Sequence, residues 1–100
     1  MAFSFLSRFL VKPEKEADFV ALAPQLEEVS RREPWTLAYK FYRLEEPGMF
    51  AVYESFIDEA ADIKHQQNPE GAALISLMVE CIDGTYTREL LIDIDAGGKV

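Results

Sequence analysis

Residues 30–67, with the sequence SRREPWTLAYKFYRLEEPGMFAVYESFIDEAADIKHQQ, contain the pattern that decides the fold. Two apolar stretches, residues 35–44 and 49–56, are separated by two glutamates, a proline and a glycine, a composition typical of a hairpin turn. Asp58 follows the second stretch and is placed to cap a short helix that runs through His65. We therefore expect two antiparallel strands and then a helix that carries the single histidine of the chain.

The sequence before this region predicts a strand and a helix. Residues 2–11 alternate as a strand does, and one of its sides is formed by Phe3, Phe5, Phe9 and Val11. Pro13 suits the first turn of the helix that follows. We expect Pro24 to kink or break that helix, because proline cannot donate a hydrogen bond to the carbonyl of residue 20.

The sequence after this region predicts a second helix and a last strand. Asn68-Pro69 indicates a helix cap followed by a first-turn proline, and Asp83-Gly84 indicates the end of that helix. A strand should then cover residues 85–94. Residues 96–100 are expected to form a frayed tail.

The order strand, helix, strand, strand, helix, strand predicts a ferredoxin-like α+β fold (βαββαβ) with a four-stranded antiparallel sheet. The length of 100 residues fits one domain over residues 1–100. Such a sheet normally shows water a polar face, yet residues 35–44 are apolar on both sides, with Trp35, Leu37, Tyr39 and Phe41 opposed to Ala38, Tyr42 and Leu44. We therefore expect the second face to be covered, most simply in a sheet-to-sheet homodimer.

The composition argues against several partners and compartments. The net charge is −8, and no cluster of Lys and Arg is present, so nucleic acid and anionic membrane are poor partners. No apolar run reaches the length of about 18 residues that spans a membrane, and the N-terminus fits a first strand better than a signal peptide. Cys81 is the one cysteine, which excludes an internal disulfide and favours a reducing, cytoplasmic location.

Cofactor sites have little support in the sequence. One histidine and one cysteine without the spacing of metal ligands indicate no zinc or iron site. Gly97-Gly98 lie at the end of the chain and do not form a phosphate-binding loop, so flavin and nicotinamide are not indicated. We therefore expect no bound cofactor.

Two segments resemble a known family. The run from Ser30 to Pro34, followed by Leu37-Ala38-Tyr39, and the run from Phe50 to Phe56, followed by Asp58, Ala60-Ala61 and His65, are similar to the antibiotic biosynthesis monooxygenase (ABM) family. The resemblance implies a dimeric α+β barrel. It also implies an enzyme, since some members oxidise quinols or polyphenols with dioxygen and without metal or flavin, although others are isomerases or have no known activity.

The chain departs from the family pattern at two positions. Trp35 stands where the family usually has glycine after the glutamate-proline pair, and this change can reshape the pocket. The asparagine often used in the oxygenase sites has no clear counterpart, because Asn68 is expected to be a helix cap. Haem-degrading relatives are set aside, since they carry a tryptophan near the position of His65 and a haem-ligating histidine further along.

His65 is the first candidate for catalysis. Its ordinary pKa of about 6.5 suits a general base that takes a phenolic proton, and it falls where the family histidine lies. The alternative is an exposed or capping histidine near a helix end.

Glu54 is the second candidate for catalysis, because it shares a strand side with Phe50 and Val52 and is not freely solvated there. It can orient His65 or accept a hydrogen bond from a ligand hydroxyl. The alternative is a structural ion pair with Arg8, Lys40 or Arg88.

Four further residues are candidates for substrate binding. Tyr39 and Tyr53 offer hydroxyls that can hold a phenol or quinone, Trp35 can stack on an aromatic ring, and Arg43 can bind an enolate or carboxylate. The alternatives are core packing for the tyrosines, core or dimer packing for Trp35, and an ion pair with Glu45 for Arg43.

These observations lead to three hypotheses for function. The first is a cofactor-independent monooxygenase of small aromatic quinols or phenols with His65 as base. The second is a non-oxidative isomerase of a small keto compound, which oxygen-independent turnover would distinguish. The third is a non-catalytic dimer that binds a small molecule, or whose pocket is filled by its own side chains; Trp35 in place of glycine favours it, and the absence of a cavity beside His65 would strengthen it.

Overall fold

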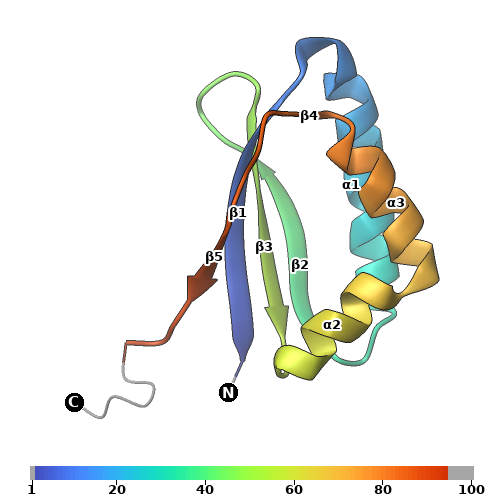
Figure 1. The fold of residues 1–100 in the computed structure, drawn as a ribbon, viewed down its shortest axis with the longest axis vertical. Helices are drawn as coiled ribbons and strands as arrows, with labels where there is room; N and C mark the ends of the chain where they lie inside the picture. The colour runs from blue at the N-terminus through green and yellow to red at the C-terminus, as the bar shows by residue number, and fades with distance from the viewer. Residues whose placement is uncertain (1, 95–100) are drawn as a thin grey trace.

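Within residues 2–94, which the computed structural model describes, five strands form one antiparallel sheet with the helices on one of its faces (Figure 1). The elements follow in the order β1 (Phe3–Val11), a 3-10 turn η1 (Pro13–Lys15), α1 (Glu16–Arg31), β2 (Thr36–Arg43), β3 (Met49–Phe56), α2 (Glu59–Gln67), α3 (Pro69–Val79), β4 (Ile82–Asp83) and β5 (Arg88–Leu91). The sheet order is β2-β3-β1-β4, and β5 pairs with the other end of β1. The predicted ferredoxin-like α+β fold is confirmed.

The hairpin between β2 and β3 forms as the sequence predicts. Gly48 adopts φ +84°, a conformation that residues with a side chain rarely take, and the amide of Leu44 donates to the carbonyl of Met49 at 3.0 Å. A bulge between Thr36 and Ala38 shifts the pairing of β2 against β3. Leu37 lies in this bulge and is 58% exposed, so it does not share a side with Tyr39 as simple alternation predicted.

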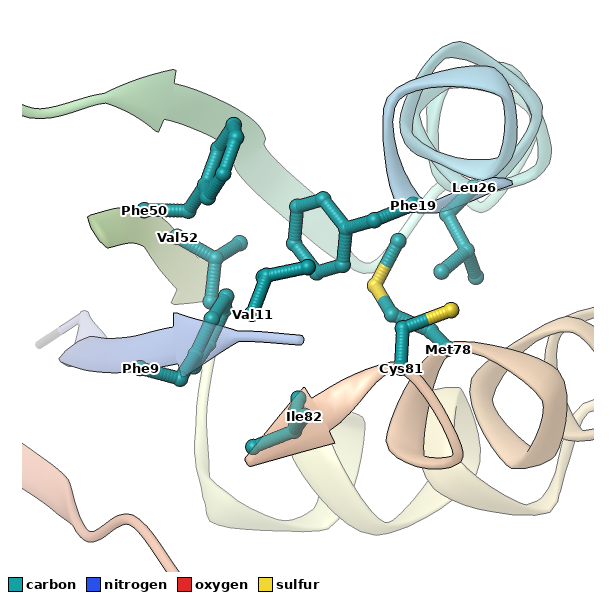
Figure 2. Close-up of a cluster of buried hydrophobic side chains, with 9 residues drawn as sticks. All are labelled: Phe9, Val11, Phe19, Leu26, Phe50, Val52, Met78, Cys81 and Ile82. Carbon is teal, nitrogen blue, oxygen red and sulfur yellow. The ribbon is translucent and has the colours of Figure 1, made fainter. Parts of the chain in front are cut away.

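The hydrophobic core lies between the inner face of the sheet and the helices α1 and α3. Figure 2 shows Phe19 of α1 lying between strand side chains and Met78. The Phe19 ring contacts those of Phe50 and Phe9 at centroid distances of 4.8 and 5.6 Å. Burial of a side chain of this size contributes about 1.5–3 kcal/mol to the stability of the fold. The whole cluster comprises Phe9, Val11, Phe19, Leu26, Phe50, Val52, Met78, Cys81 and Ile82.

The structure corrects two predictions about helix ends and interruptions. Helix α1 runs through Pro24 without a break. Pro24 lies on the exposed side of the helix, where water can satisfy the carbonyl that has lost its donor. Helix α3 ends at Val79, before the predicted stop at Asp83-Gly84, and Gly84 with φ +84° instead forms the turn after β4.

The predicted last strand, residues 85–94, is also corrected. It is divided into β4, which pairs with Leu10 and Val11, and β5, which pairs with residues 4–7 of β1. Residues 84–87 between them leave the ladder at Gly84, whose φ of +84° turns the chain after β4. The predicted tail, residues 96–100, lies outside the described residues.

The outer face of the sheet carries apolar side chains, as the sequence predicts. Leu10 and Leu91 are each 41% exposed and Tyr42 is 46% exposed. Polar groups lie among them, including an ion pair between Arg8 and Glu89 with an N–O distance of 3.0 Å. None of the helices within residues 2–94 is long and apolar enough to span a membrane.

Candidate active site

A pocket of about 190 Å³ lies between the inner face of the sheet, α2, α3 and the segment that joins β4 to β5. Most of its wall is apolar. Its polar groups include Tyr39 on β2, Glu54 on β3, His65 on α2 and Arg88 on β5. The remaining lining residues are Phe9, Phe41, Val52, Gln66, Ile75, Met78, Val79, Ile82 and Tyr86.

His65 is placed in the pocket by the short helix α2. Asp58 caps this helix, and its carboxylate accepts a hydrogen bond from the Ala61 amide at 2.8 Å. His65 is only 1% exposed, and its ring packs against Tyr39 and Phe56 at centroid distances of 4.8 and 5.2 Å. This burial excludes the alternative of an exposed histidine at a helix end.

Glu33 holds the imidazole of His65 from the side away from the pocket. Its carboxylate oxygen Oε1 lies 2.8 Å from His65 Nδ1 and accepts a hydrogen bond from the Thr36 hydroxyl at 2.8 Å. The second oxygen, Oε2, accepts a hydrogen bond from the side-chain amide of Asn68 at 2.7 Å. Glu33 is 4% exposed, so three donors replace the water that a carboxylate otherwise needs.

The contact with Glu33 determines which nitrogen of His65 is left for chemistry. A carboxylate only accepts hydrogen bonds, so the network assigns the proton of the neutral imidazole to Nδ1. Nε2 is buried and has no hydrogen-bond partner within residues 2–94. His65 lines the pocket and Glu33 does not, so the ring nitrogen that remains without a partner is Nε2.

Glu54 lies on the same pocket wall and is 8% exposed. Burial raises the pKa of its carboxyl group, while the positive charge of the Arg88 guanidinium opposes that rise. The Arg88 guanidinium lies 3.4 Å from the Glu54 carboxylate. Of the three ion-pair partners that the sequence suggested for Glu54, namely Arg8, Lys40 and Arg88, the structure therefore selects Arg88. Burial and the nearby Glu54 also raise the pKa of Tyr39, which keeps its hydroxyl protonated at neutral pH.

Three of the predicted substrate-binding residues do not line this pocket. Tyr53 faces the outer side of the sheet, because side chains alternate along a strand and Glu54 faces inward. Arg43 lies at the far end of β2, where it pairs with Glu16 at 3.0 Å rather than with the predicted Glu45. Trp35 precedes β2 and packs beneath the ammonium group of Lys64, 5.2 Å from the ring centroid.

Sequence reasoning missed the roles of Glu33 and Asn68. Asn68 is the predicted cap of α3, with its oxygen 3.3 Å from the Glu70 amide, but its amide group also binds Glu33. Glu33 was recognised only as part of a family-like motif. Its contact with His65 joins positions 32 residues apart, and no periodic pattern carries that information.

Within the described residues, no group of three His, Cys, Asp or Glu side chains is arranged to hold a metal ion.

Comparison with known proteins identifies the family of the chain. The family model described as antibiotic biosynthesis monooxygenase matches residues 3–75. The protein belongs to the ABM family. The resemblance seen in the sequence is therefore confirmed.

Two solved structures have folds closely similar to that of this chain. A crystal structure of an antibiotic biosynthesis monooxygenase has a TM-score of 0.85 and 26% identity, covering 94% of this chain and 99% of that chain. A conserved protein from Methanosarcina mazei Go1 has a TM-score of 0.84 and 26% identity, covering 91% of both chains. Both agree with the ferredoxin-like architecture of the described residues.

A curated relative matches a shorter region. An uncharacterized protein of Synechocystis sp. is 40% identical over 60 residues, which cover 59% of this chain and 41% of that protein. The match thus spans about two fifths of the length of the relative.

Proposed function

We propose that this protein is a monooxygenase that oxidises small aromatic quinols or phenols with dioxygen, and that His65 removes the hydroxyl proton. One observation carries the proposal: a buried imidazole that lines an apolar pocket is held at Nδ1 by Glu33 and has an unpartnered Nε2. A fixed tautomer with one ring nitrogen free to accept a proton is what a general base requires. Membership of the ABM family supports the same chemistry.

The proposed reaction balances with substrate and dioxygen alone. His65 Nε2 takes the hydroxyl proton, and the resulting phenolate is electron-rich enough to pass one electron to dioxygen. The radical and superoxide then combine at a ring carbon to form a peroxide, whose O–O bond breaks. One oxygen atom becomes a new ring carbonyl and the other leaves as water with two hydrogens of the substrate. The substrate thus supplies all four electrons that reduce dioxygen.

The other pocket residues would bind and orient the substrate. We assign Glu33 as a positioning residue, since it acts through His65 and does not line the pocket. Glu54 and the protonated Tyr39 hydroxyl can hydrogen-bond to the oxygen atoms of the substrate. The apolar wall, which includes Phe41 and Met78, would exclude water from the reactive anion. Trp35, Arg43 and Tyr53 have no part in this mechanism.

An isomerase of a small keto compound is the second candidate. The observation that favours it is the presence of Glu54 on the same pocket as His65. Two groups that can exchange protons then face one ligand, so that one can take a proton from a carbon and the other can return a proton to a second carbon. Such an enzyme would turn over without oxygen.

A binding protein without catalysis is the third candidate. The version of this hypothesis in which side chains of the protein fill the pocket is disfavoured, because a pocket of about 190 Å³ is present.

We also propose that two copies associate through the outer faces of their sheets. The ABM family is typically dimeric. The apolar side chains of Leu10, Tyr42 and Leu91 on this face would be covered in such a homodimer. A charge substitution such as Tyr42→Glu would then convert the dimer to monomers, which sedimentation equilibrium measures; an unchanged mass would contradict this interface.

Isotope labelling tests the oxygenase proposal. The purified protein would be incubated with 1-naphthol or 1,4-dihydroxynaphthalene under ¹⁸O₂, and the product analysed by mass spectrometry. The reaction with 1-naphthol should place one labelled oxygen in each quinone and the other in water. Protein-dependent turnover that proceeds equally well without oxygen would support the isomerase instead. Absence of any product above the autoxidation background would contradict the proposal.

A further inference from the structure

The polar end of the pocket holds more negative than positive charge. Arg88 supplies one positive charge and lies between two carboxylates, those of Asp62 and Glu54. Both terminal nitrogens of Arg88 bind Asp62, Nη2 at 2.9 Å and Nη1 at 3.3 Å, whereas its contact with Glu54 is longer at 3.4 Å. Arg88 is therefore shared between two carboxylates and is bound more closely to Asp62, so the two negative charges have one positive charge between them.

Arg88 is also fixed in place, so it is not free to turn toward a ligand. The guanidinium carbon lies 3.8 Å from the centroid of the Phe5 ring, which covers one face of the group. Asp62 is itself held by Gln66, whose side-chain amide donates to Oδ1 at 3.1 Å. An anionic ligand would have to break the forked contact between Arg88 and Asp62 to gain a cationic partner.

We propose that the pocket selects uncharged hydroxyaromatic ligands and rejects those that carry a carboxylate, because Glu54 faces the ligand without a free cation to offset it. This inference rests on the proposed function and names the charge class of its substrate. A ligand hydroxyl can donate to the Glu54 carboxylate or to His65 Nε2, and His65 Nε2 would thereby gain the partner that it lacks. A ligand carboxylate has no donor of this kind and adds a like charge beside Glu54.

The phenolate of the proposed reaction does not meet the same penalty. Its proton moves only to His65 Nε2, so the imidazolium and the phenolate form a pair and the total charge of the occupied pocket is unchanged. A carboxylate that arrives as an anion brings an additional negative charge. The pocket can therefore favour formation of an anion from a neutral substrate and still disfavour an anionic substrate.

The volume of the pocket limits the ligand to one or two rings. An apolar protein cavity of about 150 Å³ holds a benzene molecule. The pocket here measures about 190 Å³, and its lining includes the exposed residues Gln66, Val79 and Tyr86. A single substituted ring fits within this space, and a second ring would occupy the remainder of it.

A pair of near-isosteric probes tests the inference directly. Dissociation constants for 4-hydroxybenzamide and 4-hydroxybenzoate would be measured at pH 7.5 by NMR titration of the labelled protein, which reaches millimolar affinities. The two probes have almost the same shape and differ by one charge. We expect the amide to bind at least about tenfold more tightly, a difference that corresponds to about 1.4 kcal/mol.

Two variants assign the discrimination to the pocket charges. Glu54→Gln removes one of the two carboxylates and should bring the two dissociation constants within about threefold of each other. Asp62→Asn frees the Arg88 charge and should make 4-hydroxybenzoate the tighter ligand. Glu89→Gln changes the net charge by the same amount on the outer face of the sheet, where Glu89 pairs with Arg8, and should leave the ratio unchanged.

Each outcome separates this inference from the proposed function. Equal or tighter binding of 4-hydroxybenzoate by the wild-type protein would overturn the charge selection and leave the oxygenase proposal intact. A ratio that Glu54→Gln and Glu89→Gln shift equally would overturn the role of Glu54. Binding of neither probe would overturn the inference together with the proposed function.

Discussion

Two charged networks lie at the C-terminal end of α1, one at the surface and one in the interior. At the surface, Arg32 binds Glu28 at 3.3 Å and Glu70 at 2.7 Å, and these side chains are 50–65% exposed. In the interior, Glu33 binds His65 at 2.8 Å, and both side chains are 2% exposed. The distances are alike, and both networks connect α1 to the helices that follow the hairpin.

Burial makes the two networks different in energy and in use. Water solvates the surface carboxylates whether or not the arginine is present, so each contact adds little. Glu33 has no water to replace its protein donors, and the loss of either partner leaves a buried group unsatisfied. The interior network can therefore fix the tautomer of His65, whereas the surface network remains hydrated and adds little to stability. The predictions that follow test this difference.

Glu33→Ala should have the largest effect. It removes the acceptor of three donors, the buried His65 and the half-buried Thr36 and Asn68, and should lower the free energy of unfolding by about 3–5 kcal/mol. Glu28→Ala at the surface should cost less than about 1 kcal/mol. Urea denaturation of both variants measures these changes. Losses of equal size would show that burial does not separate the two networks.

Glu33→Gln should reduce activity more than its effect on stability explains. The side chain keeps its shape, but an amide group can donate toward Nδ1 and so no longer selects one tautomer. We expect kcat to fall by about 10- to 100-fold, as when the group that orients a functional histidine is removed. The nitrogen chemical shifts of His65 should show a single tautomer, protonated at Nδ1, in the wild-type protein and a mixture in the variant. An unchanged tautomer with lost activity would contradict positioning by Glu33.

Asn68→Ala should have an intermediate effect. Asn68 caps α3 through its oxygen and binds Glu33 through its amide group, so one substitution removes both contacts. We expect a loss of about 1–2 kcal/mol in thermal or chemical unfolding. Asp58→Ala removes the cap of α2 alone and provides a comparison. A smaller loss at Asn68 than at Asp58 would mean that the contact with Glu33 adds nothing.

The contact between Arg32 and Glu70 should give the smallest effect. A double-mutant cycle with Arg32→Ala and Glu70→Ala should yield a coupling energy of about 0.2–1 kcal/mol. About 1 M salt should remove most of this coupling, because both side chains are exposed to screening ions. Coupling that persists at high salt would mark this surface pair as equivalent to the buried one.

The fold was predictable because its signals are local. The alternation in β1, the Pro-Gly turn before β3, the Asp58 cap and the Asn68-Pro69 start of α3 each act within a few residues. The divided last strand was not predictable in this way. Its pairing depends on where the helices bring the chain back to β1, and the apolar residues of 88–94 are compatible with a longer strand.

The candidate site was predictable only in part. His65, Glu54 and Tyr39 were found because they are titratable or aromatic residues on elements with a clear pattern, and the structure brings them to one pocket. Arg43 and Tyr53 were placed by residue type alone, and strand direction and side-chain alternation take them elsewhere. The contacts of Glu33 join three separate elements, so they emerge only when the chain is folded.

The most direct measurement is the initial rate of dioxygen uptake with 1,4-dihydroxynaphthalene, corrected for autoxidation, for the wild-type protein and for His65→Gln. Removal of the base should lower the protein-dependent rate by at least about 100-fold, whereas Lys64→Ala, one residue away on the exposed side of α2, should leave it unchanged. Equal rates for the wild type and His65→Gln, or no uptake that depends on the protein, would contradict catalysis by the buried histidine.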